Sequence, residues 1–163
     1  MDKLEYKINE VAFNIAQILD KNEINKLLGV LANDGVYAMW VYALDKIKIE
    51  DKKDKIGLLI NHIFNFLDLF PILKENQGET EGKDDKIKRL QELNNGIIEL
   101  LKKEKLNDKE KIELKNKIKE RNKLILEIFK ELSKDIDNLL FFKEILERTL
   151  ILARYHAKAL GDD

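Results

Sequence analysis

Apolar residues recur at the spacing of an amphipathic helix along most of the chain, and this periodicity constrains the fold more than any other feature. In residues 2–21, for instance, the apolar pattern i, i+3, i+4, i+7 is followed by Leu4, Ile8, Val11 and Ile15. The chain has one proline and seven glycines, so few positions interrupt a helix. No stretch alternates apolar and polar residues as a half-buried strand does. The sequence therefore predicts an all-α fold.

The same periodicity predicts a bundle of about six or seven helices in one domain that spans residues 1–163. A chain of 163 residues is long enough to bury a core without disulfides or a structural metal. The expected helix bounds are about 2–21, 23–32, 36–47, 54–70, 86–106, 108–132 and 138–160. Pro71 lacks an N–H and disfavours helix in the residue before it, so we expect the fourth helix to end or kink there.

Two further segments follow that proline. Residues 74–85 contain no large apolar residue, which predicts a mobile loop. The next two helices meet at Asn107, which is placed to form a capping box with Glu110. A connection this short makes the helices antiparallel neighbours, so residues 86–132 are expected to form a long charged helical hairpin. Its apolar stripes are narrow and bury little, which allows the hairpin to be an appendage of the bundle.

A turn signal opens the most apolar helix of the chain. In Asn33-Asp34-Gly35, the Asn and Asp side chains can cap free backbone N–H groups and the glycine tolerates a positive φ. The helix that follows carries the chain's one tryptophan, Trp40, at core spacing. Tyr37 and Tyr42 are left open between core packing and stacking on bases.

No residue pattern indicates catalysis or metal binding. Cysteine is absent, and the two histidines, His62 and His156, lie on or beside apolar stripes where core or half-buried positions are expected. Glu127 and Glu131 are interleaved with lysines, as in ordinary i, i+4 surface pairs. Glycine-rich phosphate loops and hydrolase signatures are missing. We therefore expect no enzyme activity, no metal and no cofactor.

Charged residues make up 37% of the chain, but the formal net charge is only -1, so bulk charge indicates no partner. The absence of cysteine suits a reducing cytoplasm. No apolar run reaches the roughly 20 residues of a membrane span. Local clusters are more informative, and the first is formed by Lys46, Lys48, Lys52, Lys53 and Lys55. This cluster is either a phosphate-contacting surface or a solvated connector, and composition alone favours the connector.

Two further regions carry excess positive charge. Residues 102–134 contain twelve basic and seven acidic residues. The excess of positive charge either keeps the chain soluble or serves binding. Arg148 and Arg154 lie on the last predicted helix, six residues apart, so they do not share one face. Arg154 and Lys158 are spaced i, i+4 and can act together.

The turn Asn33-Asp34-Gly35, followed by an apolar helix that ends in Asp45-Lys46, resembles the N-terminal signature of a known protein family. That family is the small all-helical subunit of type III-B CRISPR effectors, the fifth protein of the Cmr complex. Arg148-Thr149-Leu150 and residues 153–160 are similar to the final helix of the same family. The order of these parts and the chain length also agree.

The resemblance implies a non-catalytic, cytoplasmic subunit that serves antiviral defence. Its expected partners are other subunits of the effector complex, copies of itself stacked head to tail, crRNA and target RNA, with no membrane contact. Basic side chains would hold the RNA backbone. The predicted RNA-binding residues are Lys26, Lys46, Lys48, Lys52, Lys53, Arg148, Arg154 and Lys158.

The alternative is a helical protein-interaction module that does not bind nucleic acid. In that interpretation the long charged hairpin is the docking surface, and the exposed lysines only keep the chain soluble.

Overall fold

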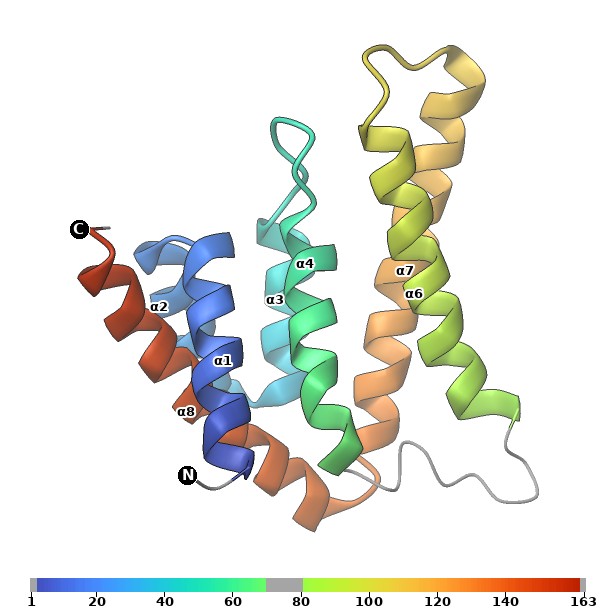
Figure 1. Ribbon diagram of the computed structural model, residues 1–163. Helices are drawn as coiled ribbons and strands as arrows, with labels where there is room; N and C mark the ends of the chain where they lie inside the picture. Colours follow the sequence, from blue (N-terminus) through green and yellow to red (C-terminus); the bar gives the residue numbers. More distant parts are fainter. Residues whose placement is uncertain (1–2, 70–80, 162–163) are drawn as a thin grey trace.

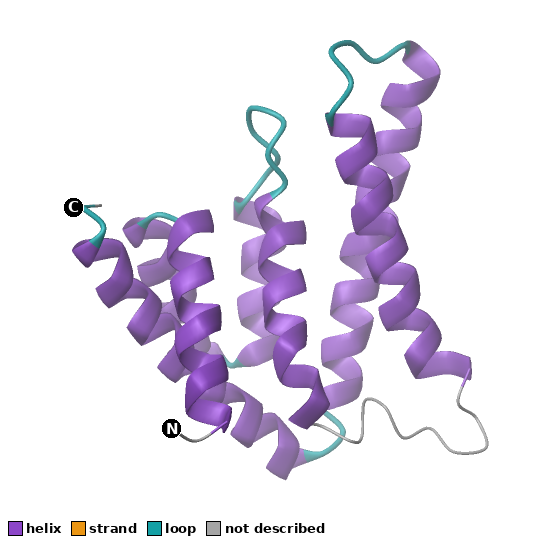
Figure 2. Cartoon of the chain, viewed as in Figure 1, coloured by secondary structure: helices purple, strands orange, loops and turns teal. Residues whose placement is uncertain are grey.

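The computed structural model describes residues 3–69 and 81–161. These residues form α-helices and one 3-10 helix, without any strand (Figures 1 and 2), which confirms the all-α prediction. The elements are α1 Lys3–Ile18, α2 Lys21–Asp34, α3 Val36–Lys46, α4 Lys55–Ile63, the 3-10 helix η1 Phe64–Leu69, α6 Glu81–Leu101, α7 Asp108–Leu132 and α8 Ile136–Ala159. No helix in the described ranges is both long and apolar enough to cross a bilayer.

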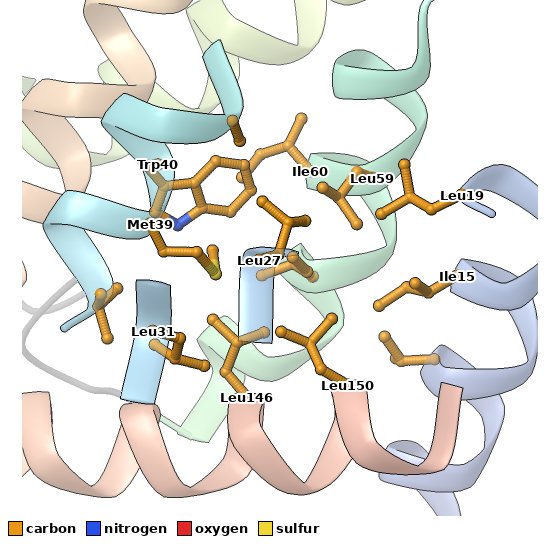
Figure 3. Close-up of a cluster of buried hydrophobic side chains, with 14 of the residues drawn as sticks. Ile15, Leu19, Leu27, Leu31, Met39, Trp40, Leu59, Ile60, Leu146 and Leu150 are labelled. Carbon is orange, nitrogen blue, oxygen red and sulfur yellow. The ribbon is translucent and has the colours of Figure 1, made fainter. Parts of the chain in front are cut away.

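The helices surround one apolar core. The long helix α8 runs beneath the N-terminal helices and packs against both α1 and α2, while α6 and α7 stand together on the opposite side (Figure 1). Figure 3 shows the core side chains of α1, α2, α3, α4 and α8 pointing toward one another. Each of these helices contributes the apolar stripe that its sequence periodicity predicted.

The joint between α2 and α3 forms as predicted. Gly35 has a φ of 96°, a backbone conformation that residues with a side chain rarely adopt. Its N–H donates to the carbonyl oxygen of Leu31 at 3.0 Å, and its own carbonyl accepts from the N–H of Met39 at 3.0 Å. One residue therefore ends α2 and starts α3. Asn33 and Asp34, by contrast, belong to the last turn of α2.

Trp40 is the largest fully buried side chain, with an exposed fraction of 0%, so its core assignment is confirmed. Its indole stacks on the ring of Phe129, with centroids 5.0 Å apart and planes 16° apart. Phe129 in turn meets the ring of Phe142 edge to face at 5.4 Å. This row of rings joins α3, α7 and α8. The two tyrosines left open by the sequence differ, because Tyr37 is exposed and Tyr42 is partly buried.

The hairpin of α6 and α7 is antiparallel, as the Lys86–Glu127, Arg89–Glu120 and Lys103–Glu110 ion pairs along its length indicate. The capping box is confirmed: the N–H of Glu110 donates to Asn107 Oδ1 at 2.8 Å, and the N–H of Asn107 donates to Glu110 Oε1 at 3.1 Å. The connection between the helices is longer than the single residue expected, because α6 ends at Leu101.

The hairpin is not an appendage. The last turns of α7 enter the main core through Ile125, Ile128, Phe129 and Leu132, all of which are buried. The apolar stripe of α7 is concentrated in the C-terminal half of the helix, which faces the bundle. For this reason the stripe looked narrow in the sequence. The first half of α7 carries exposed lysines and the exposed Ile112.

Two other bounds differ from the prediction. The fourth helix ends at Ile63 and continues as the 3-10 helix Phe64–Leu69, ahead of the predicted stop at Pro71. In the predicted mobile loop, residues 74–80 lie outside the described residues, whereas residues 81–85 are helical and begin α6. A polar segment can extend an established helix without burying apolar surface, because adding a residue costs less than nucleating a new helix.

A buried polar cluster, missed in the sequence, ties the hairpin to α4. Arg121 of α7 is only 2% exposed, and its guanidinium is hydrogen-bonded to Asp54 and lies 3.3 Å from Asn94 Oδ1. Asp54 also accepts from the N–H of Gly57 at 3.2 Å and so caps α4. A β-carbon at residue 57 would collide with the Asp54 carboxylate, which explains the glycine. Asn94 extends the cluster by donating to Asn61 at 3.1 Å.

We expect Trp40→Ala to destabilise the protein by about 3–5 kcal/mol, because it removes the ring on which Phe129 stacks and leaves a cavity. Trp40→Phe should cost less, since it keeps an aromatic ring and removes an indole N–H that has no partner among the described residues. Urea denaturation of both variants measures the difference. Tyr37→Ala is the control, with an expected change within about 0.5 kcal/mol. Equal losses for both Trp40 variants would contradict the packing role.

Arg121→Ala should destabilise the protein by about 3–5 kcal/mol, because it leaves the Asp54 carboxylate buried without its cation. The double variant Arg121→Ala/Asp54→Ala should lose less than the sum of the two single variants, since no unpaired charge then remains. The double-mutant cycle is measured by urea denaturation. Additive losses would show that the two side chains do not stabilise each other.

Candidate nucleic-acid interface

The first basic cluster lies on the tight turn between α3 and α4. Asp51 and Lys52 have φ values of 51° and 62°, and the N–H of Lys53 donates to the carbonyl of Glu50 at 2.8 Å. Two successive residues with positive φ are the pattern of a type I′ turn, which reverses the chain within four residues. The turn, which contains Lys52 and Lys53, extends beyond the adjoining ends of α3 and α4 (Figure 1).

Neighbouring backbone oxygens position two lysines of this cluster. Lys52 Nζ donates to the carbonyl oxygens of Lys103 and Glu104, at 3.0 and 3.4 Å, and so ties the turn to the hairpin connection. Lys48 Nζ donates to the carbonyl of Leu44 at 3.3 Å. Carbonyl oxygens carry no net charge, so both ammonium groups keep their attraction for an anion.

The sequence-level cluster of residues 46–55 is not uniformly exposed. Lys46, Lys48, Lys52 and Lys53 are exposed, but Asp54 is buried in the polar cluster with Arg121. Lys55 is half-buried and forms an ion pair with Glu23 of α2 at 3.0 Å. The interpretation of this segment as an exposed connector is therefore wrong at its C-terminal end, where the chain enters α4.

The other predicted residues lie on α2 and α8, which pack together. Arg154 reaches α2, with its Nη1 3.5 Å from Asn25 Oδ1, and its guanidinium lies 5.7 Å from the ring centre of Tyr155. Lys26, the neighbour of Asn25, and Lys158 are both exposed. The basic residues of α2 and α8 therefore lie on two helices that pack together, and they are separate from the basic residues of the turn between α3 and α4.

Arg148 has different surroundings. It is exposed and shares the i, i+4 stripe of α8 with Leu152 and His156, whose ring contacts Phe13 of α1. Arg154 faces α2 instead. The contact of Arg154 with α2 agrees with the prediction that the two arginines do not share one face.

Charge pairing separates the predicted residues from many cations of the hairpin. Of the eight predicted residues, only Lys46 has a carboxylate partner within the described part of the chain, Asp45 at 3.6 Å. Several hairpin cations, by contrast, pair with carboxylates of the hairpin itself: Lys86, Arg89, Lys102, Lys103 and Lys117. Part of the positive charge at residues 86–132 therefore holds the hairpin together, whereas the eight predicted residues keep most of theirs.

Neither histidine lies in a metal-binding arrangement. His62 and His156 are both half-buried, as predicted, and the ring of His156 packs edge to face against Phe13 at 5.6 Å. No group of three histidines or carboxylates that could hold a metal ion exists among the described residues. Glu127 and Glu131 do form ion pairs, but not at the expected i, i+4 spacing: Glu127 pairs with Lys86 across the hairpin, and Glu131 pairs with Lys134 at i, i+3.

Sequence reasoning missed the exposed aromatic residues of α1. Tyr6 is 59% exposed and Phe13 is 43% exposed, and both line a groove between α1 and α8. The available signal was their spacing: they lie seven residues apart, outside the buried stripe of residues 2–21. Base stacking was considered only on α3, where Tyr37 and Tyr42 were left open.

The pKa of His62 predicts how stability responds to pH. Burial lowers this pKa below its ordinary value of 6.5, and the negative charge of Glu10 opposes the shift. The unfolded chain therefore binds a proton at His62 more tightly than the folded chain does. As a result, the contribution of His62 to the free energy of unfolding is present above pH 6.5 and is lost as pH falls below it. His62→Gln should reduce the loss of stability between about pH 7.5 and about pH 5.5 in urea denaturation. An unchanged pH response in the variant would contradict this assignment.

Comparison of the chain with protein-family models, with curated proteins and with solved structures found no match. The function must therefore be inferred from the residues themselves. Two features stand out: cations without carboxylate partners among the described residues, and an aromatic groove between α1 and α8.

Proposed function

We propose that this protein is a non-catalytic small subunit of a type III CRISPR ribonucleoprotein complex, in which it holds RNA by the phosphate backbone. One observation carries the RNA-binding part: seven of the eight predicted cations have no carboxylate partner among the described residues. The assignment to the CRISPR complex, and to type III-B in particular, rests on the sequence resemblance.

Unpaired cations suit this role for an energetic reason. A cation that already pairs with a carboxylate must give up that partner before it can contact a phosphate, whereas an unpaired one need only release water and counterions. The candidate cations also project from a rigid scaffold, because the turn between α3 and α4 is tied down by Lys52 and α8 is packed along its length. Phosphate contacts of this kind position RNA without reading its sequence.

Assembly with other proteins is the second part of the proposal. The start of α8 exposes three large apolar side chains, Ile136, Leu140 and Phe141. Adjacent exposed apolar residues commonly mark protein contacts, so this end of α8 is where we place an interface with another subunit or a further copy of the chain. A cytoplasmic location follows from the proposed complex.

The same apolar residues support the second candidate, a helical protein-interaction module without nucleic-acid binding. In that case the chain would bind partners normally and carry no RNA. The hairpin is a weaker docking surface than the sequence indicated, since α7 contributes to the main core.

The decisive variant is Arg154→Glu/Lys158→Glu. We expect it to retain several-fold less RNA than the wild type when the tagged full-length protein is purified from its native host, because two side chains that attract phosphate are replaced by two that repel it. Each phosphate contact that the double variant removes should also make the log-log salt slope of RNA binding less steep by about 0.7. Retained RNA is quantified and sequenced, and the co-purified subunits are identified by mass spectrometry.

Lys102→Glu/Lys117→Glu is the charge-matched control, because it makes the same charge change at two hairpin lysines that already pair with carboxylates, Glu99 and Glu113. This control should keep its RNA. RNA without CRISPR repeat sequence would refute the assignment to a CRISPR complex, and equal retention by all variants would refute the phosphate contacts. Normal partner binding with no RNA in any sample would favour the interaction module.

A further inference from the structure

A groove of about 560 Å³ lies between α1 and α8. This volume falls in the range of pockets that bind small organic ligands, roughly 300–1,000 Å³. Its walls combine three aromatic rings, Tyr6, Phe13 and His156, with the apolar Leu152 and the polar side chains of Asn9, Glu10 and Asn14. Flat apolar surface and hydrogen-bonding groups therefore occur together in one groove.

The aromatic rings are placed to receive a flat ligand. Tyr6 and Phe13 lie two helical turns apart on one face of α1, a rise of about 10.5 Å. At this spacing, a planar ring about 3.4 Å thick has room to stack against either side chain. The edge-to-face contact with His156, at 5.6 Å and 80°, fixes the Phe13 ring at the wall of the groove. A nucleobase has the size and shape to stack there.

The polar groups of the groove favour a base over a phosphate. Glu10 lines the groove, and as a carboxylate it repels phosphate but can accept a hydrogen bond from the amino group of adenine, cytosine or guanine. The amide of Asn14 offers both a donor and an acceptor for a base edge. Uracil lacks an exocyclic amino group, so it would satisfy Glu10 least well.

Arg148 supplies a place for the phosphate that follows the base. It lies one helical turn before Leu152, which lines the groove, and it is exposed, with no carboxylate partner among the described residues. Helices α1 and α8 run in the same general direction (Figure 1) and His156 contacts Phe13, so a position eight residues before His156 falls toward the Tyr6 end of the groove. Arg154, which contacts α2, is not placed to serve this groove.

We propose that this groove binds one amino-bearing nucleobase of single-stranded RNA, which stacks on Phe13 while Arg148 contacts the adjoining phosphate. The proposal rests on the proposed RNA-binding function and extends it, because it adds a base contact to contacts with the backbone alone. It also turns a sequence-independent interaction into one with a preference for adenine or cytosine over uracil.

The test uses the purified full-length protein and a single-stranded 12-nucleotide RNA that carries 2-aminopurine, a fluorescent adenine analogue whose emission falls when it stacks. Anisotropy of an end label measures binding, and 2-aminopurine emission measures stacking. Phe13→Leu keeps an apolar side chain but removes the aromatic face, so we expect affinity to fall about fivefold or more and the quenching to disappear. An oligouridine 12-mer should bind the wild type more weakly than an oligoadenosine 12-mer.

Tyr37→Leu, at an exposed aromatic residue of α3 outside the groove, is the matched control and should bind and quench as the wild type does. Binding without quenching, or with quenching that survives Phe13→Leu, would overturn the base pocket and leave the proposed backbone contacts intact. Absence of any binding at low salt would overturn both. If Phe13→Leu instead weakens self-association in sedimentation while RNA binding is unchanged, the groove is a protein contact and the proposal is wrong.

Discussion

The stack of Trp40 on Phe129 is the contact on which the arrangement of the molecule depends. The two residues are 89 positions apart, and their rings join α3 to the hairpin helix α7, while Phe142 adds α8 to the same row. An aromatic stack buries a large apolar area in one defined geometry, so it fixes orientation as well as proximity. Without it, the hairpin would still be attached to the bundle through Ile125, Ile128 and Leu132 and through the polar cluster around Arg121, but it would lack this stacked contact.

That polar cluster contributes specificity rather than bulk stability. A buried arginine is desolvated at considerable cost, and its attraction to Asp54 does little more than offset that cost. The geometry of the cluster, however, allows only one position of α7 relative to α4, because Asp54 caps α4 and Arg121 belongs to α7. The cluster also sets the turn between α3 and α4 directly beside the hairpin connection, where Lys52 contacts two carbonyl oxygens. Core packing therefore determines where the candidate cations project.

The surface charge divides into two populations with different roles. Several hairpin cations pair with glutamates of the hairpin and stabilise it, while most of the candidate cations on α2, on α8 and on the turn, like other lysines of α7, have no carboxylate partner among the described residues. The groove between α1 and α8 adds a third kind of surface, aromatic and only weakly charged. Together these surfaces fit a single-stranded polyanion whose backbone follows cations and whose bases can unstack, which is the ligand class that the proposed function requires.

The sequence by itself determined the all-α class, the capping box at Asn107 and the turn at Gly35, because these depend on residues a few positions apart. It also placed Trp40 in the core, since helical periodicity records which face is buried. Only the tertiary structure decided that Arg121 and Asp54 are buried partners, that α7 belongs to the core, and that Tyr6 and Phe13 face α8. Periodicity reports how each helix is divided between core and solvent, but not which helices meet, and contacts between residues far apart in the chain depend on that choice.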